Sequence, residues 1–261
     1  MTIQMKKEAH MTGQDLMDMV QLRPEDVGKY AIVPGPRERA DAIVKKLTNP
    51  VKNFSFMEYT MHTGDFEGIR LTTINGGRFA ADTSITTEIL CNAKIQGMIR
   101  TGSCGALRAD IKVGDLVIID TALKGEGVTQ YYVKKDFVPT ADKDLTASLK
   151  QSAESSEHFQ MMPDNKVHFG KCWTTDAILR ETREHVGKAV QEGAIAVDMV
   201  TAAFLTICQL YKIPAAVIMA VSDNVITGEM GFLNPDYYMA EGAMLDIALN
   251  TVRKLEGVAK A

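Results

Sequence analysis

The chain has 261 residues, of which 46% are hydrophobic, and its 29 basic and 33 acidic residues give a net charge of −4 at pH 7. The length suits one large α/β domain or two small ones, and the apolar fraction excludes a disordered chain. No repeat or Pro/Gly-rich linker divides the sequence, so we predict one domain over 1–261, with 1–20 as a less ordered extension. The charge provides no basic surface for nucleic acid or for an anionic membrane. We therefore expect a small molecule, or a second copy of the chain, as the partner.

Short apolar runs alternate with helical patterns, which is typical of an α/β domain with a mixed central β-sheet flanked by helices. Strands are predicted at Tyr30–Pro34, Gly68–Ile74, Gly97–Thr101, Asp115–Thr121, Lys166–Trp173, Ala194–Met199 and Ala215–Ser222. Helices are predicted at Arg37–Leu47, Asp82–Ile95, Asp142–Glu157, Thr182–Glu192, Val200–Tyr211 and Asp236–Leu255. In such a sheet, ligands bind beyond the carboxyl ends of the strands.

The first predicted strand leads into Pro34-Gly35-Pro36 and then a helix. The backbone N–H groups of such a turn, together with the helix N-terminus, can bind an anion, and Arg39 could close over it. The same pattern more often marks an ordinary connection between a strand and a helix. This segment alone therefore does not establish a binding site.

The stretch IRTGSCGAL at 99–107 places an arginine, a hydroxyl, a thiol and two glycines after an apolar strand. Three interpretations compete: an anion-binding turn formed by Arg100, Ser103 and backbone N–H groups, a nucleophile at Cys104, or a turn without chemistry. No base that would lower the pKa of Cys104 lies nearby in the sequence, which favours a buried thiol.

Two later strands carry carboxylates toward the same edge of the sheet. Asp198 interrupts an apolar run and is compatible with a helix cap, a structural carboxylate or a ligand contact. Asp223 is compatible with a general acid or with a turn cap. The charged run at 180–184 is interpreted as the solvated start of a helix.

The four cysteines are far apart and show no metal-ligand spacing, so we interpret them as reduced thiols. No apolar run reaches the length of about eighteen residues that a membrane span requires, and the N-terminus resembles no export signal. The sequence predicts a cytoplasmic protein that binds no metal.

Taken together, five motifs resemble the nucleoside phosphorylase family, which includes purine nucleoside phosphorylase, uridine phosphorylase and methylthioadenosine nucleosidase. The motifs are PGPxxRA at 34–40, EYT at 58–60, RTGSCGAL with IxVGDLV at 100–117, VDM at 197–199, and VSDN with TGE at 221–229. The resemblance implies a single nucleoside phosphorylase-like domain. It also implies that Gly35, Arg39, Arg100 and Ser103 bind phosphate.

The resemblance further implies a nucleoside-binding side of the site. Met199 matches the methionine under the ribose, and Ile178 falls where the family often has an aromatic that stacks on the base. Asp223 matches the catalytic aspartate that, in purine-specific relatives, assists departure of the base at N7. Uridine phosphorylases usually carry an apolar residue there, so Asp223 favours a purine nucleoside.

Several positions depart from the family pattern. Val200 replaces the glutamate that binds the ribose hydroxyls, and Met57 replaces an arginine that reaches the neighbouring subunit's phosphate site. A histidine from the neighbouring subunit corresponds approximately to Met19. The usual glycine-rich turn is altered at Gly76–Asp82, where Arg78 is a candidate to replace the missing arginine. A valine cannot accept a hydrogen bond, so an ordinary riboside should bind poorly.

The expected activity is cleavage of an N-glycosidic bond of a nucleoside, with inorganic phosphate as the second substrate and no metal or organic cofactor. The alternative is a catalytically impaired relative that binds or stores a nucleoside or an anion. Because family sites form between subunits, a homodimer or homohexamer is expected.

Overall fold

The structure is a computed structural model that describes residues 9–158, 162 and 164–258. The strands are β1 (Tyr30–Pro34), β2 (Thr48–Phe56), β3 (Tyr59–Phe66), β4 (Ile69–Ile74), β5 (Gly97–Ala106), β6 (Leu116–Gly125), β7 (Val167–Thr175), β8 (Ala194–Asp198), β9 (Ala215–Asn224) and β10 (Glu229–Met230). The α-helices are α1 (Gly13–Met19), α2 (Arg37–Val44), α3 (Ala80–Asn92), α4 (Lys143–Glu154), α6 (Arg183–Gln191), α7 (Thr201–Tyr211) and α8 (Pro235–Leu255).

The strands form one mixed sheet in the order β10-β9-β6-β7-β8-β5-β1-β4-β3-β2, with an additional pairing between β9 and β5. Strands β5, β9, β6, β7 and β8 thereby close into a ring, from which β1, β4, β3 and β2 extend. Strand β5 is parallel to both β1 and β9, so these three strands end at the same edge. The end of β8 reaches that edge from the opposite direction, with Val197 opposite Gly105.

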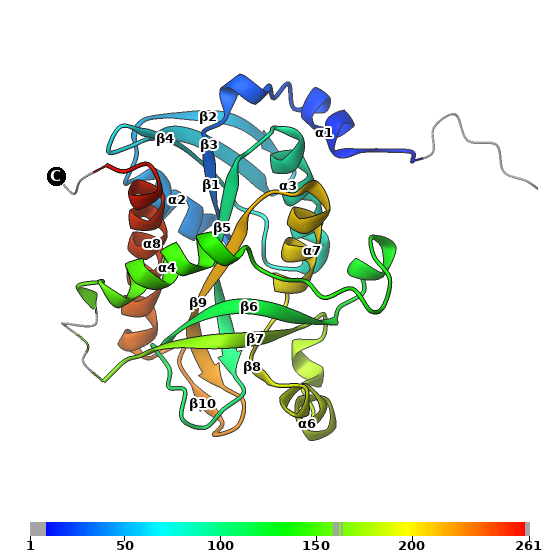
Figure 1. Cartoon of the computed structure of the whole chain (residues 1–261), viewed down its shortest axis with the longest axis vertical. Coiled ribbons are helices and arrows are strands. Elements are labelled where there is room, and N and C mark those ends of the chain that lie inside the picture. Colours follow the sequence, from blue (N-terminus) through cyan, green and yellow to red (C-terminus); the bar gives the residue numbers. More distant parts are fainter. Residues whose placement is uncertain (1–8, 159–161, 163, 259–261) are drawn as a thin grey trace, which may run out of the picture.

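Helices cover both faces of the sheet (Figure 1). Successive residues of a strand point to opposite faces, so Ile32 packs in the layer with α2, α4 and α8, whereas Val33 packs in the layer with α1, α3 and α7. Helix α8 lies beside α4 and contacts β9, β5 and β1. This arrangement brings the first turns of α8 next to the ends of the parallel strands.

The predicted fold class is confirmed, and seven of the ten strands coincide with predicted ones. Strands β2, β3 and β10 were not predicted. Strand β2 is an edge strand with a mostly exposed, polar surface and lacks the apolar alternation of a strand, and β10 has only 2 residues. One strand boundary matters for the site. The predicted strand Gly97–Thr101 continues to Ala106, so IRTGSCGA at 99–106 is not a turn but part of β5.

The first 20 residues were expected to be less ordered, and 1–8 lie outside the described residues. Gly13–Met19 is nevertheless helical. Thr12 and Asp15 form a capping box, in which the Thr12 backbone N–H donates to Asp15 Oδ2 at 2.9 Å. Met17 anchors this helix in the apolar core, with only 1% of its surface exposed.

Candidate active site

A cavity of about 410 Å³ lies at the sheet edge where β1, β5, β8 and β9 end, and it is closed on one side by the first turns of α8. Its volume lies in the usual range for small-molecule sites. All eight residues that the sequence assigned to phosphate, the nucleoside or catalysis line this cavity: Gly35, Arg39, Arg100, Ser103, Ile178, Met199, Val200 and Asp223. The parallel pairing of β1, β5 and β9 brings Gly35, Ser103 and Asp223 to one edge, and the end of β8 adds Met199 and Val200.

The glycines of β5 are required by close approach rather than by a turn. A Cβ atom at Gly102 would lie 3.0 Å from Cζ and both Nη atoms of Arg100, and one at Gly105 would lie 3.0 Å from Asp223 Oδ2. Contacts this short would force the neighbouring groups to move. The two glycines therefore leave room for a guanidinium and a carboxylate directly against the strand.

Arg100 is buried and only partly paired. Its Nη2 donates to Asp198 Oδ2 at 3.2 Å, and both side chains are nearly inaccessible to solvent. Its Nε and Nη1 are buried and have no hydrogen-bond partner among the described residues. Burial lowers the pKa of the guanidinium, and the neighbouring Asp198 carboxylate opposes that effect. Arg100 thus keeps two donors that an anion in the cavity would satisfy.

Asp198 combines two of its three proposed roles, as a helix cap and as a structural carboxylate. It accepts from the Thr201 backbone N–H at 3.0 Å and from the Thr201 hydroxyl at 2.7 Å, at the start of α7. It also accepts from the Thr174 hydroxyl of β7 at 2.9 Å. The Arg100 ion pair is therefore connected to β7 and to the N-terminus of α7.

Arg39 extends from the first turn of α2 and is already paired. Its Nε donates to Glu241 Oε1 at 3.0 Å, its Nη2 donates to the same oxygen, and its Nη1 donates to the Thr101 carbonyl at 3.2 Å. The Tyr237 hydroxyl also donates to Glu241 Oε1, at 3.2 Å. Burial raises the pKa of Tyr237, Glu241 adds to the rise, and Arg39 and the Ser103 hydroxyl oppose it. Ser103 and Arg39 therefore lie on the same side of the cavity.

Asp223 is half-buried at the end of β9, where its Oδ1 accepts from the Ser222 hydroxyl at 2.7 Å. Glu181 lines the same cavity. Burial, and then the charge of Asp223, raise the pKa of Glu181 to about 7. The interpretation of 180–184 as a solvated helix start was therefore wrong for Glu181. The alternating charges of this segment are typical of a solvated surface, and nothing in the local sequence indicates that Glu181 lies near Asp223.

The part of the cavity that Met199, Val200 and Ile178 line is apolar. Val200 is 1% exposed and packs in the core at the N-terminus of α7, next to the half-buried Met199. Ile178, Phe232 and Tyr238 are each at least half exposed where they line the cavity. This side of the cavity therefore offers few hydrogen-bond partners.

Cys104 lines the cavity as a buried thiol. Its exposed fraction is 3%, and burial raises its pKa well above the usual value, with further contributions from the Asp198 and Asp223 charges. A thiol in this environment stays protonated at neutral pH and is a poor nucleophile. The structure thus favours the buried-thiol interpretation.

Of the positions that depart from the family pattern, some line the cavity and others lie away from it. Gly77 and Arg78 of the altered turn line the cavity. Met57 lies in the turn between β2 and β3 at a φ of 51° and is 75% exposed, and Met19 is 54% exposed. Neither methionine lines the cavity of its own chain.

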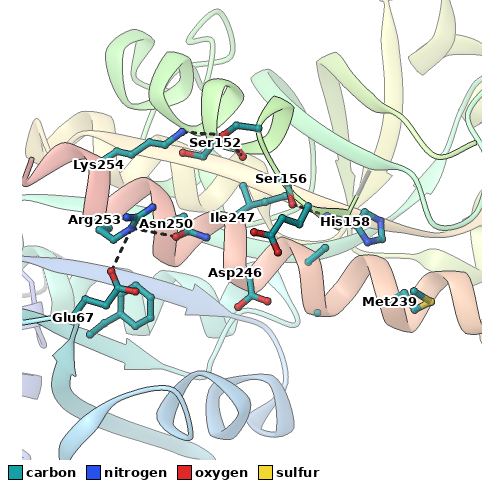
Figure 2. A pocket seen from close by; sticks show the side chains of 15 residues that line it. Glu67, Ser152, Ser156, His158, Met239, Asp246, Ile247, Asn250, Arg253 and Lys254 are labelled. Atoms are coloured by element: carbon teal, nitrogen blue, oxygen red, sulfur yellow. Dashed lines mark hydrogen bonds and ion pairs between the residues drawn. The ribbon is translucent and has the colours of Figure 1, made fainter. Parts of the chain in front are cut away.

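A second hollow of about 690 Å³ lies along α8 (Figure 2). Its cations have partners on the hollow's own walls: Arg253 Nε lies 3.4 Å from Glu67, and Lys254 donates to the Ser155 hydroxyl at 3.1 Å. Of the residues that the sequence singled out, none lines it. The cavity at the strand ends is therefore the better candidate for the active site.

Within the described part of the chain, no helix is both long and apolar enough to span a membrane. No group of three or more His, Cys, Asp or Glu side chains in that part is arranged to hold a metal ion.

The structure thus combines a mixed α/β sheet with a cavity at the strand ends that Arg39 and Arg100 line. A family model described as "Phosphorylase superfamily" matches residues 29–244, and the chain belongs to this family. Its curated relatives include nucleoside phosphorylases, which are pentosyltransferases.

Three curated relatives illustrate the range of names in the family. A guanosine phosphorylase of Halorubrum lacusprofundi is 27% identical over 236 residues, which are 88% of this chain and 95% of that protein. A uridine phosphorylase of Thermococcus kodakarensis is 27% identical over 86% of this chain and 83% of its own length. A DeoD-type purine nucleoside phosphorylase of Bacillus cereus is 28% identical over 80% of this chain and 88% of its own length.

Solved structures share the fold. A uridine phosphorylase of Vibrio fischeri gives a TM-score of 0.80 at 23% identity, over 90% of this chain and 95% of the other. A purine nucleoside phosphorylase of Toxoplasma gondii gives 0.80 at 20% identity, over 98% and 99%. The expected nucleoside phosphorylase-like fold is thereby confirmed.

Proposed function

We propose that this protein is a nucleoside phosphorylase that cleaves the N-glycosidic bond of a purine nucleoside with inorganic phosphate. The observation that carries the proposal is the buried guanidinium of Arg100, whose Nε and Nη1 have no partner among the described residues. A buried cation with unused donors is matched by an anion. Arg39, Ser103 and Gly35 line the same cavity and would complete the phosphate site.

The chemistry follows from the charges around the cavity. Cleavage of an N-glycosidic bond passes through a transition state with positive charge on the sugar. Phosphate held by Arg39 and Arg100 would stabilise this charge and attack C1′ of the sugar. Asp223, near the end of β9, would assist departure of the base as its general acid or hydrogen-bond partner.

The kind of base and the kind of sugar in the substrate are inferred from the side chains that line the cavity. Asp223 favours a purine base, and Glu181 adds a second carboxyl group at the same end of the cavity. Met199 and Val200 offer no hydrogen-bond acceptor comparable to a carboxylate, which favours a sugar with fewer hydroxyls. We therefore propose a deoxyriboside or another modified purine nucleoside in preference to an ordinary riboside.

A homodimer, or a hexamer built from dimers, is the proposed assembly. The apolar side chains of Ile178, Phe232 and Tyr238 at the cavity are exposed in the single chain, which supports a partner subunit at this place. Light scattering at micromolar concentrations would give a dimer or hexamer mass. A monomer would overturn this part of the proposal.

The alternative is a relative that binds a nucleoside or an anion without turnover. The observations that favour it are Val200 in the core and the exposed Met57, which leave two polar contacts of the family unmade within this chain. Binding without release of a base would support this alternative.

A panel of purine and pyrimidine ribosides and deoxyribosides, incubated with and without phosphate and analysed by chromatography, tests the proposal. Release of a purine base only in the presence of phosphate is expected. Release that does not depend on phosphate would instead indicate hydrolysis. Failure of every nucleoside to react would leave the binding function in its place.

A further inference from the structure

Helix α8 places a carboxylate where an anionic ligand would bind Arg39. Glu241 Oε1 accepts from Nε of Arg39 at 3.0 Å and also from its Nη2. The Arg39 side chain is 5% exposed, whereas that of Glu241 is 26% exposed. The carboxylate therefore reaches a buried cation from the more open side of the cavity.

The pairing uses donors from both arginine and tyrosine. The Tyr237 hydroxyl donates to Glu241 Oε1 at 3.2 Å, and the remaining Nη1 of Arg39 donates to the Thr101 carbonyl at 3.2 Å. Every nitrogen of this guanidinium thus has an acceptor. Arg100, in the same cavity, has two nitrogens without a partner in the described part of the chain.

We propose that Glu241 is an internal competitor for phosphate, which holds Arg39 in the empty site and must leave it before phosphate binds. The inference rests on the proposed function, because it assumes that Arg39 belongs to a phosphate site. Two anions in this small cavity repel each other, and both need the same Nε and Nη2 donors of Arg39. The affinity for phosphate therefore depends on how much more tightly Arg39 binds phosphate than it binds the Glu241 carboxylate, and not on the arginines alone.

The partial exposure of Glu241 makes this exchange feasible. A side chain at the rim of a cavity can turn toward water, where its charge is solvated, without opening the core. Helix α8 need not move, because its buried residues, such as Met244 and Leu245, pack against the sheet side of the helix. Only the Glu241 side chain has to change its rotamer.

The test is calorimetric titration of inorganic phosphate into the wild type and into Glu241→Gln. The amide keeps an oxygen that can accept from Arg39 but carries no charge, so phosphate should bind about tenfold or more tightly to the variant. Asp246→Asn is the matched control. It removes the same charge from the same helix, but its side chain lies in the second hollow and pairs with Lys46 at 2.7 Å, so its phosphate affinity should equal that of the wild type (Figure 2).

Tyr237→Phe supplies a second variant if Glu241→Gln does not fold. It removes one donor from the Glu241 carboxylate and should raise phosphate affinity by a smaller factor in the same direction. Equal affinities of wild type and Glu241→Gln, or of wild type and Tyr237→Phe where that variant is the one measured, would overturn the competitor role and leave the phosphate site intact. Absence of phosphate binding by all of these proteins would overturn the proposed phosphate site, and the competitor role with it.

Discussion

The two sides of the cavity differ in how closely they are connected to the fold. On the side proposed to bind phosphate, called the anion side below, Arg100 pairs with Asp198, and Asp198 also accepts hydrogen bonds from the start of α7 and from the Thr174 hydroxyl. On the side proposed to bind the sugar, called the sugar side below, Met199 and Val200 contribute apolar surface. A substitution on the anion side therefore disturbs polar contacts between several elements, whereas one on the sugar side changes apolar packing and what the cavity can bind. On the anion side, the same ion pair contributes both to stability and to the proposed binding.

The largest effect is expected for Arg100→Ala. It leaves the Asp198 carboxylate buried without its counter-charge, which should lower the free energy of unfolding by about 3–5 kcal/mol, as measured by urea denaturation. Phosphate binding should be lost at the same time. Arg108→Ala is the control, because its ion pair with Asp110 is exposed and should contribute at most about 1 kcal/mol. Equal stability of the Arg100 variant and the wild type would show that the threonines alone sustain Asp198, and would break the comparison.

Val200→Glu tests the sugar side. If the missing carboxylate alone limits ribosides, the variant should gain about tenfold or more in riboside binding or turnover, since a hydrogen bond to a charged group contributes about 1.5–3 kcal/mol. Deoxyribosides should gain less, because they have one hydroxyl fewer to satisfy.

Val200→Leu is the matched control for this gain, because it alters packing at the same buried position without adding an acceptor. It should leave the preference between ribosides and deoxyribosides unchanged. Absence of a gain in a folded Val200→Glu variant would mean that other departures, such as the altered turn at Gly76–Asp82, limit the sugar site.

The sequence predicted the lining of this cavity better than its contacts. Apolar periodicity located the parallel strands, and parallel strands must end together, so Arg39, Arg100 and Asp223 were expected at one edge. The sequence could not predict that Arg39 pairs with Glu241, 202 residues away, because that contact depends on where α8 crosses the sheet. The glycines of β5 were misread as a turn because glycine is typical of turns, whereas here they admit Arg100 and Asp223 against a strand.

Glu181→Gln is expected to change the pH dependence of stability by a smaller amount. Burial and Asp223 raise the pKa of Glu181 from 4.5 to about 7, so between these values the folded protein keeps a proton that the unfolded chain releases. This contribution to stability is complete below pH 4.5 and is lost as the pH rises through about 7.

The glutamine variant has no such proton, so the difference in thermal midpoint between wild type and Glu181→Gln should decline across that window. Glu184→Gln is the control from the next helix, where a hydrogen bond from Lys188 lowers the pKa of an exposed carboxyl. Its difference from the wild type should not decline over the same range. Parallel profiles of Glu181→Gln and the wild type would place Glu181 in an ordinary solvated environment.

The smallest effect is expected for Cys104→Ala, although this side chain lines the cavity beside both carboxylates. Burial and the charges of Asp198 and Asp223 raise the pKa of the thiol, so at neutral pH it is neither a thiolate nor a proton donor of useful strength. Removing the sulfur should cost about 1 kcal/mol of stability and leave the rate of base release near that of the wild type. Iodoacetamide should fail to label Cys104 in the native protein at pH 7, and labelling should appear only on denaturation.

A loss of activity by several orders of magnitude, with the fold intact, would instead identify a nucleophile, because no other role of a buried thiol is that large. Cys104 lies between Ser103 and Gly105 on β5. Such a result would also mean that β5 contributes to the reaction through a reactive side chain, and not through the room that its glycines leave for Arg100 and Asp223.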